Sequence, residues 1–204
     1  MPEPTPAQTH TITSTRLLEG LRDPENQTVW ADFVARYRPM LVKYASRFGL
    51  RDDEAQDAAQ QTLIAFCTAY QQGKYNREQG RLRVWLFGIA RNIMLNMVKR
   101  RRHREVQVLE ASQNTNFFAR LPDEDELEKA WEEEWRDALL RQCMEEVRRE
   151  FDPKSVEAFH LYVTEGLPAQ EVGRRLGMTA NAVFLVKHRI MKRIRELLPL
   201  LDDA

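Results

Sequence analysis

The stretch that decides the fold is residues 81–105, which read Arg-Leu-Arg-Val-Trp-Leu-Phe-Gly-Ile-Ala-Arg-Asn-Ile-Met-Leu-Asn-Met-Val-Lys-Arg-Arg-Arg-His-Arg-Glu. It begins as an almost wholly apolar segment and ends in a block of positive charge. Apolar residues recur at helical spacing on one side and are frequent on the roughly opposite side too, a pattern typical of a helix inside a bundle. The predicted buried face comprises Leu82, Trp85, Leu86, Ile89, Ile93 and Met97, and the second apolar side comprises Val84, Phe87, Leu95 and Val98.

One polar strip remains on this helix when successive residues are placed about 100° apart. Asn and Arg side chains hydrogen-bond base edges and phosphates, and an aromatic ring stacks on an unpaired base. The segment therefore predicts a nucleic-acid-binding helix rooted in a helical core, with the basic end from Lys99 to Arg104 beside the strip. The strip consists of Arg81, Gly88, Asn92, Asn96 and Lys99, with Trp85 at its edge.

Length and composition narrow the class of protein. The 204 residues suffice for one large domain or two small ones, and the charged residues, 30 % of the chain, balance to a net charge of zero. The balance hides a segregation, because residues 81–105 are strongly basic and residues 123–134 strongly acidic. With no secretory signal and no apolar run near the roughly 20 residues of a membrane span, we expect a cytoplasmic protein. Cys67 and Cys143 are expected to be buried free thiols, and no Cys or His spacing suggests a metal or a cofactor.

Helical patterns fill the first half of the chain. Residues 1–15 are rich in Pro and Thr and are predicted to be a disordered tail, with a short helix starting near its end. A longer helix is expected after a cap at Thr28, and Pro39 inside its pattern predicts either a kink or two abutting helices. The helix that Asp52 opens has an unusual outer face, polar but with few full charges, which fits either plain solvation or the docking of a partner. The residues of that face singled out here are Asp57, Gln60 and Gln61.

Residues 71–80 are predicted to be a loop, because they contain glycines and lack apolar periodicity. The loop carries an aromatic stacking group among polar and cationic neighbours and leads directly into the 81–105 helix. This loop cluster consists of Lys74, Tyr75, Asn76 and Arg77.

Residues 106–134 are predicted to be a flexible acidic linker, because periodicity fades there before Pro122 and the acidic run. Trp131 and Trp135 lie one helical turn apart, so the end of the run is expected to grade into a helix. The acids are either simply solvated or occupy a basic groove that nucleic acid uses later.

The C-terminal third has the pattern of a helix-turn-helix. Gly177 supplies the sharp turn, Met178 fills the core, and Thr179 caps a second helix from Ala180 to about Leu197. Because that helix is basic, DNA binding is favoured over a merely structural set of three helices. The predicted inner face is Val183, Val186, Ile190, Ile194 and Leu197; the outer face is Asn181, Phe184, Leu185, His188 and Arg189, with Lys187, Lys192, Arg193 and Arg195 near phosphates.

These two nucleic-acid signatures, joined by an acidic segment, resemble an extracytoplasmic-function sigma factor, a specificity subunit of bacterial RNA polymerase. The resemblance covers about residues 16–198. Residues 57–66 are similar to the family's polymerase-clamp helix, and residues 81–92 are similar to its promoter-melting segment. The resemblance implies an all-α fold of two small helical domains. These are a bundle at residues 16–105 and a helix-turn-helix domain at residues 135–198, followed by a tail at residues 199–204.

The resemblance also implies roles for individual residues. Docking on the polymerase clamp is implied for Asp57, Gln60 and Gln61. Recognition and melting of the downstream promoter element is implied for Lys74, Tyr75, Asn76, Arg77, Arg81, Trp85, Asn92, Asn96, Lys99 and Arg100. Readout of the upstream element is implied for Asn181, Phe184, Leu185, Lys187, His188, Arg189 and Arg193.

Some positions depart from the family pattern. Phe184 and Leu185 are apolar where hydrophilic side chains are usual, and Asn96 stands where an acid is common. Gly173 replaces the customary alanine, a change expected to be sterically harmless.

The implied function is that of a transcription initiation factor, not an enzyme, which directs core RNA polymerase to specific promoters. The implied partners are the clamp and flap regions of the polymerase, promoter DNA and an anti-sigma factor, and the protein would be associated with the nucleoid. A second hypothesis is a stand-alone helix-turn-helix regulator with an N-terminal sensory or dimerisation domain, which would bind a palindrome without polymerase and with a steep salt dependence. An enzyme is disfavoured, because the sequence lacks clustered carboxylates, a metal set, a phosphate loop and a nucleophile elbow.

Overall fold

The computed structural model describes residues 14–23, 25–76, 78, 80–110 and 123–202, and these residues are all-α, as predicted. The chain divides into two units inside one helix: Leu18–Leu139 lie in the first unit and Leu140–Asp202 in the second. No helix among the described residues is long and apolar enough to cross a membrane. The elements are α1 (Ser14–Gly20), α2 (Gln27–Arg47), α3 (Asp52–Gln71), α4 (Leu82–Glu110), α5 (Glu124–Glu150), α6 (Pro153–Phe159), the π-helix η2 (His160–Thr164), α7 (Ala169–Leu176) and α8 (Ala180–Leu201).

The start of α2 differs from the prediction. The Asn26 side chain accepts a hydrogen bond from the Val29 amide at 3.3 Å, so Asn26 is the cap and Thr28 lies inside the helix. α2 also runs through Pro39 as one helix rather than two. Pro39 is exposed, so the hydrogen bond that its missing N–H would have made is lost on the solvent side, where water can replace it.

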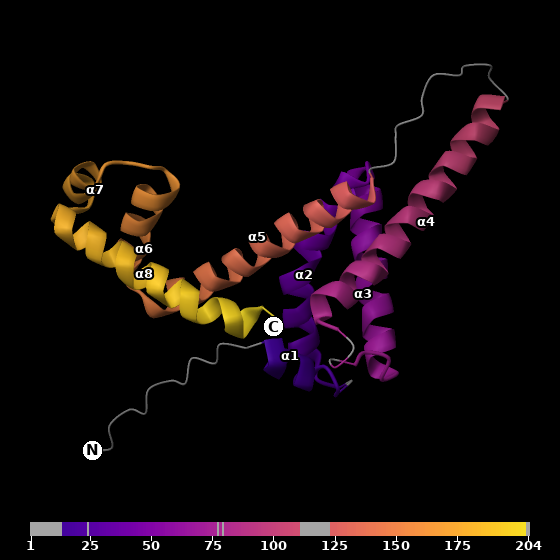
Figure 1. The fold of residues 1–204 in the computed structure, drawn as a ribbon, viewed down its shortest axis with the longest axis horizontal. Helices are drawn as coiled ribbons and strands as arrows, with labels where there is room; N and C mark the ends of the chain where they lie inside the picture. The colour runs from indigo at the N-terminus through magenta and orange to yellow at the C-terminus, as the bar shows by residue number, and fades with distance from the viewer. Residues whose placement is uncertain (1–13, 24, 77, 79, 111–122, 203–204) are drawn as a thin grey trace. The chain divides into compact units, whose positions relative to one another are not determined.

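α2 and α3 pack against each other, and α4 packs against α3 (Figure 1). Their core contains a stacked pair, Phe33 on Phe66, with ring centroids 4.4 Å apart, and Phe66 lies 5.1 Å from Trp85. The buried face of α4 agrees with the predicted one at Leu82 and Leu86 but not beyond them. Its fully buried residues follow an i, i+4 row, whereas Ile89, Ile93 and Met97 are half-buried. Because apolar residues occur on both sides of this helix, the sequence pattern did not single out the buried row. The row comprises Leu82, Leu86, Ala90, Met94 and Val98.

The acidic run belongs to a packed helix. Trp131 and Trp135 on α5 are each 2 % exposed. The Trp131 ring centroid lies 5.0 Å from that of Tyr44, and the Trp135 centroid lies 5.3 Å from that of Tyr37. The N-terminal half of α5 is thereby part of the core of the first unit.

The predicted flexible linker is therefore wrong where the structure describes it. Residues 106–110 complete α4 and residues 124–134 begin α5, while residues 111–122 lie outside the described residues. The reason is an apolar stripe at spacing three and four among the acids, which buries one face of the helix. Its members are Leu127, Ala130, Trp131, Trp135 and Ala138.

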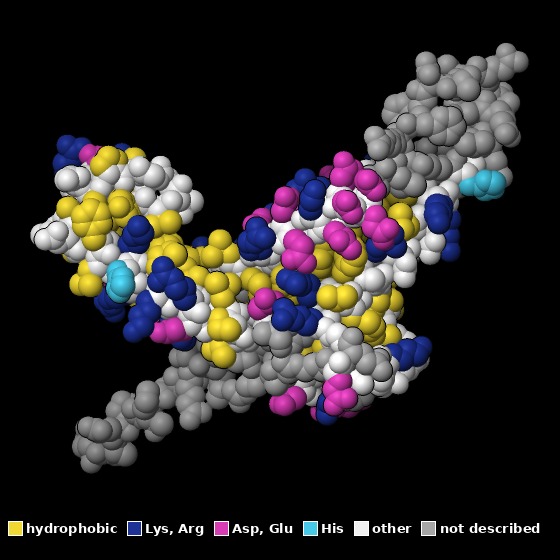
Figure 2. Space-filling model, viewed as in Figure 1, with side chains coloured by type: hydrophobic (Ala, Val, Ile, Leu, Met, Phe, Trp, Pro, Cys, Tyr) yellow, Lys and Arg dark blue, Asp and Glu magenta, His cyan; other side chains and the backbone are white. Residues whose placement is uncertain are grey.

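Arginines of α2 and α4 neutralise part of the acidic run. Figure 2 shows acidic side chains gathered over the N-terminal half of α5, with Lys and Arg side chains among them. The ion pairs, with their N–O distances, are Arg83–Glu132 at 3.1 Å, Arg91–Glu124 at 2.5 Å, and Arg47–Glu133 and Arg47–Glu134 at 3.6 Å each. Exposed ion pairs contribute only about 0–1 kcal/mol each to stability. The burial of Trp131 and Trp135 therefore holds α5 in the first unit. The ion pairs instead determine which arginines have their charge neutralised.

In the second unit, Asp152 caps the N-terminus of α6. Asp152 accepts hydrogen bonds from the Ser155 amide at 2.9 Å and the Ser155 hydroxyl at 2.7 Å. The bonds from the Ser155 hydroxyl and amide hold the pKa of Asp152 below its ordinary value. The helix that Asp152 caps begins as α6 and changes to the wider π-helix η2 at His160.

α7 and α8 form the predicted helix-turn-helix. Gly177 adopts the left-handed conformation with φ 60° and ψ 48°, and the Thr179 hydroxyl accepts a hydrogen bond from the Ala182 amide at 3.1 Å. The inner face of α8 is confirmed, because Val183, Val186, Ile190, Ile194 and Leu197 are all buried.

Gly173 is not sterically neutral, contrary to expectation. A Cβ atom at this position would lie 2.5 Å from the backbone carbonyl oxygen of Met178, closer than real Cβ contacts come. The Met178 amide donates to the Gly173 carbonyl at 2.8 Å, so the turn is drawn tightly onto α7. An alanine here requires the turn to move.

Candidate nucleic-acid interface

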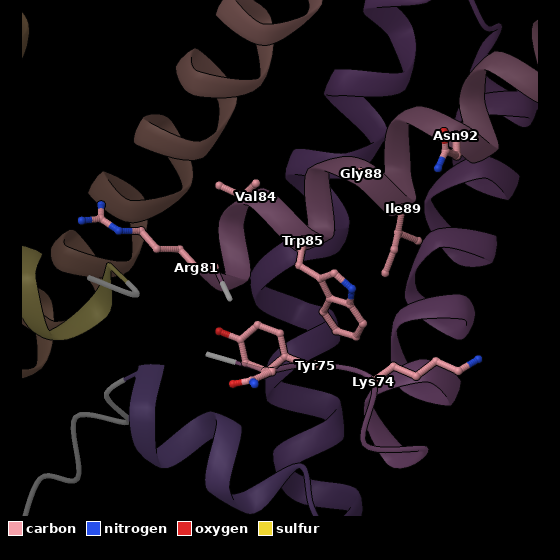
Figure 3. Close-up of a pocket in the computed structure, with 10 residues that line it drawn as sticks. Lys74, Tyr75, Arg81, Val84, Trp85, Gly88, Ile89 and Asn92 are labelled. Atoms are coloured by element: carbon pink, nitrogen blue, oxygen red, sulfur yellow. The ribbon is translucent and has the colours of Figure 1, made fainter. Parts of the chain in front are cut away.

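A hollow of about 470 Å³ opens on the first unit between the loop after α3 and the start of α4 (Figure 3). Its volume lies in the range of small-ligand sites, about 300–1,000 Å³. The hollow brings the predicted loop cluster and the predicted helix strip together in one place. Its lining residues are Lys74, Tyr75, Asn76, Gly80, Arg81, Val84, Trp85, Gly88, Ile89 and Asn92.

An aromatic wall forms one side of the hollow. The ring centroids of Tyr75 and Trp85 are 5.1 Å apart, and Figure 3 shows the two rings beside each other. Tyr70 stacks on Tyr75 at 5.8 Å, and its hydroxyl donates to the Leu18 carbonyl. Tyr70 therefore holds the Tyr75 ring in position. A fixed aromatic face with amides and cations at its rim suits a nucleobase turned out of its stack.

The polar strip continues along α4 beyond the hollow. Asn92, Asn96, Lys99 and Arg100 are all exposed. Arg77 and the side chains of residues 102 and 104 lie outside the described residues.

Arg101 belongs to the basic block but not to the strip. Its guanidinium donates to the Gly49 carbonyl at 2.8 Å and to Glu54 at 3.0 Å. Burial alone would raise the pKa of Glu54, but hydrogen bonds from the Arg51 amide and the Arg101 guanidinium outweigh it, and the pKa lies below its ordinary value. This arginine ties α4 to the start of α3.

The outer face of α3 is exposed at Asp57, Gln60 and Gln61. The Gln61 side-chain amide donates to the Asp57 carboxylate at 2.9 Å, so these two side chains are held together one turn apart. Ile64, a turn further on, is an exposed large apolar residue on the same helix. A polar face with an apolar residue at its end is open to a partner.

The outer face of α8 divides into open and engaged residues. Asn181, Phe184, Leu185 and His188 are exposed. Arg189 is also exposed but lies over the Phe151 ring, 5.4 Å from its centroid.

Lys187 and Arg193 are held by neighbouring residues. Lys187 lies over the Tyr162 ring at 5.5 Å. The Arg193 guanidinium donates twice to Glu150, at 2.6 Å each, which raises the pKa of Arg193 above its ordinary value. Contact between Arg193 and a phosphate would require this pair to open.

Four residues in the wall of the hollow were not assigned a role from the sequence: Gly80, Val84, Gly88 and Ile89. Gly88 was placed only in the polar strip of the helix. Val84 and Ile89 were expected on the apolar sides of the helix, yet Val84 is 57 % exposed. A signal for them exists in the sequence, since both residues flank the polar strip on a helical wheel.

Two features bear on metal binding and on thiol chemistry. Among the described residues, no group of His, Cys, Asp or Glu could hold a metal ion. Burial raises the pKa of Cys67 and Cys143 to about 11, so both free thiols stay protonated at neutral pH and are poor nucleophiles.

Comparison with known proteins indicates the class. The family model of sigma-70 region 2 matches residues 33–104, which include most of α2, all of α3 and the aromatic and polar parts of α4. Residues 33–104 are therefore similar to region 2 of sigma factors, which are transcription initiation factors of RNA polymerase and not enzymes.

Two curated relatives extend the match over most of the chain. The ECF RNA polymerase sigma factor SigE of Mycolicibacterium smegmatis (strain ATCC 700084 / mc(2)155) is 25 % identical over 91 % of this chain and 68 % of its own length. The RNA polymerase sigma factor CarQ of Myxococcus xanthus is 27 % identical over 89 % of this chain and 95 % of its own length. The solved structure of CnrH in complex with the cytosolic domain of CnrY matches 90 % of this chain and 95 % of that chain at 22 % identity, with a TM-score of 0.36. The chain is thus similar over most of its length to RNA polymerase sigma factors, one of them of the extracytoplasmic-function type.

Proposed function

We propose that the protein is a sigma factor whose first unit recognises and melts the downstream promoter element, and whose helix-turn-helix reads the upstream element. The observation that carries the proposal is the hollow between the 71–80 loop and α4, whose aromatic wall continues into the exposed strip of Asn92 and Asn96. A bound base and its flanking backbone need these two features next to each other.

In this proposal the hollow captures one base of the non-template strand. Unstacking a base costs a few kcal/mol. Stacking of that base on Tyr75 and Trp85 offsets part of the cost, since base–aromatic stacking contributes about 1–3 kcal/mol per base. Lys74 and Arg81 at the rim supply charge for the adjoining phosphates.

The strip on α4 then holds the duplex just upstream of the captured base. Asn92 and Asn96 lie one turn apart and offer amide donors and acceptors, and Lys99 and Arg100 follow with fixed positive charge. The amides would contact base edges or sugars, and the cations would set the register on phosphates.

Docking on core polymerase is assigned to the outer face of α3. Asp57, Gln60 and Gln61 are too weakly charged for DNA attraction, and the acid would repel phosphates. The same face suits the polar surface of a protein partner. Grip on DNA would therefore come mainly through the complex with polymerase.

Two pairs of substitutions separate these assignments. Asn92→Ala with Asn96→Ala should lower promoter opening by roughly tenfold and leave the affinity for core polymerase unchanged. Asp57→Ala with Gln60→Ala should weaken polymerase binding by roughly tenfold, with opening restored at saturating protein. Promoter opening is followed by the reactivity of unpaired thymines, and polymerase binding by titration of labelled protein. Gln27→Ala, an exposed amide on the first turn of α2, serves as the control.

Equal effects of both pairs on both measurements would refute the division of roles. Tight binding to a palindromic DNA without polymerase would instead support the stand-alone regulator.

A further inference from the structure

The groove-facing side of α8 has apolar residues at its centre. Asn181, Phe184, Leu185 and His188 follow the i, i+3, i+4, i+7 spacing of one helical face. Phe184 is 47 % exposed and Leu185 is 59 % exposed, while the core positions beside them are filled by buried valines. Phe184 and Leu185 are therefore surface residues and not part of the hydrophobic core. They form a small apolar patch where a recognition helix normally contacts base edges.

The patch is held in place by a neighbouring helix. The Tyr162 ring, on η2, meets the Phe184 ring edge-on, with centroids 5.7 Å apart and an interplanar angle of 81°. The Lys187 ammonium lies 5.5 Å from the centroid of the same tyrosine ring. Tyr162 thus fixes both an apolar and a cationic side chain of α8. A ring that is fixed in advance loses little side-chain entropy when it is covered.

The charge around the patch indicates the nature of its partner. Lys187, Arg189, Lys192 and Arg195 lie on the same helix, and all are exposed. Cations around an apolar centre match a surface with phosphates at its rim and apolar groups inside it. The major groove of DNA is such a surface, and its apolar group is the C5-methyl of thymine.

We propose that Phe184 and Leu185 read thymine methyl groups in the upstream promoter element, and that Tyr162 is a positioning residue for this readout. The inference rests on the proposed function, in which α8 enters the major groove of that element. It adds the chemical basis of the specificity. Neither side chain can hydrogen-bond a base edge, so discrimination at these positions comes from apolar contact and shape.

The test replaces thymine by deoxyuridine, which lacks only the methyl group. Upstream sequences that support transcription are first selected from a random library with the reconstituted complex of this protein and core polymerase. Deoxyuridine is then placed singly at each thymine of the selected element. We expect one or two positions at which the affinity of the complex falls about fourfold, the value of one buried methyl(ene) group.

Variants assign the methyl contact to particular side chains. In Phe184→Ala or Leu185→Ala the difference between thymine and deoxyuridine should disappear at one position each. Tyr162→Ala should reduce the difference, and Tyr162→Phe should keep it, because the edge-on ring contact does not use the hydroxyl. Val163→Ala, an exposed apolar residue on the same π-helix, is the matched control and should keep the full difference.

The outcomes distinguish this inference from the function on which it rests. If no upstream sequence is selected at all, readout by α8 fails and the inference falls with it. If a sequence is selected but deoxyuridine is tolerated at every position, the function stands and methyl readout is refuted. If Phe184→Ala lowers polymerase affinity and leaves methyl discrimination intact, the patch is a protein-docking surface and the inference is wrong.

Discussion

Two glycines on different helices show how far the effect of one methyl group depends on its surroundings. A Cβ atom at Gly88, inside α4, would have no neighbouring atom within 4 Å, whereas a Cβ atom at Gly173 would meet the Met178 carbonyl. Both glycines stand within a helical sequence pattern, and only the packing around them separates the two positions.

The substitution Gly88→Ala should raise the free energy of unfolding of the first unit by about 0.5–1 kcal/mol, because alanine is the better helix former. It should also weaken promoter opening, since the new methyl enters the wall of the hollow. Gly173→Ala should lower the stability of the second unit, because overpacking costs about 1–3 kcal/mol and exceeds the gain in helix propensity. Chemical denaturation followed by circular dichroism measures both, and an increase for Gly173→Ala would contradict the close approach described.

Two carboxylates should make stability depend on pH. The pKa values of Glu54 and Asp152 are lowered in the folded protein. Each carboxylate therefore contributes stability above its unfolded pKa, about 4.3 for Glu and 3.9 for Asp, and that contribution is lost as the pH falls through the folded value. The melting temperature should fall as the pH decreases below about 4.5.

Glu54→Gln and Asp152→Asn should each flatten that fall, and the asparagine keeps the cap on α6. Thermal unfolding at a series of pH values checks this. Curves of wild type and variants that stay parallel down to acidic pH would show that these two groups do not carry the dependence.

At the scale of elements, the sequence predicted what local spacing determines. The inner face of α8 and the turn at Gly177 follow from five apolar positions and one left-handed residue, and both are confirmed. The buried row of α4 was not predictable in the same way, because that helix is apolar on several sides. Which side becomes buried depends on how the neighbouring helices pack against it. The prediction of a flexible linker was wrong for the acidic run. Its many charges indicated solvation, but the apolar stripe that carries Trp131 and Trp135 buries one face of the helix.

Removing that stripe should unfold the first unit more easily. Trp131→Ala should cost about 3–5 kcal/mol, as large-to-small changes of buried aromatic residues do. Lys129→Ala, an exposed change on the same helix, should stay within about 0.5 kcal/mol of wild type. Urea denaturation followed by tryptophan fluorescence reports this unit alone, because the 4 tryptophans, Trp30, Trp85, Trp131 and Trp135, all lie in it. A stability change below about 1 kcal/mol for Trp131→Ala would mean that α5 is not part of that core.

At the scale of the whole molecule, the net charge of zero is the sum of a strongly basic segment in α4 and a strongly acidic segment in α5. Arg83 and Arg91 of α4 are paired with acids of α5, while Asn92, Lys99 and Arg100 stay exposed. The sequence indicated the strip and the loop cluster separately. Their union in one hollow depends on Tyr75 and Trp85 meeting in space, which no local pattern encodes.

The measurement that tests base capture most directly is an abasic scan of the downstream element. In a promoter with a preformed bubble, each base of the non-template strand is removed in turn, and the affinity of the polymerase complex is measured with wild type and with Tyr75→Ala. Base capture predicts one or two positions where loss of the base lowers wild-type affinity about tenfold and hardly affects Tyr75→Ala, because the two changes remove the same stacking contact. If base removal and Tyr75→Ala weaken binding independently at every position, the hollow does not hold a base.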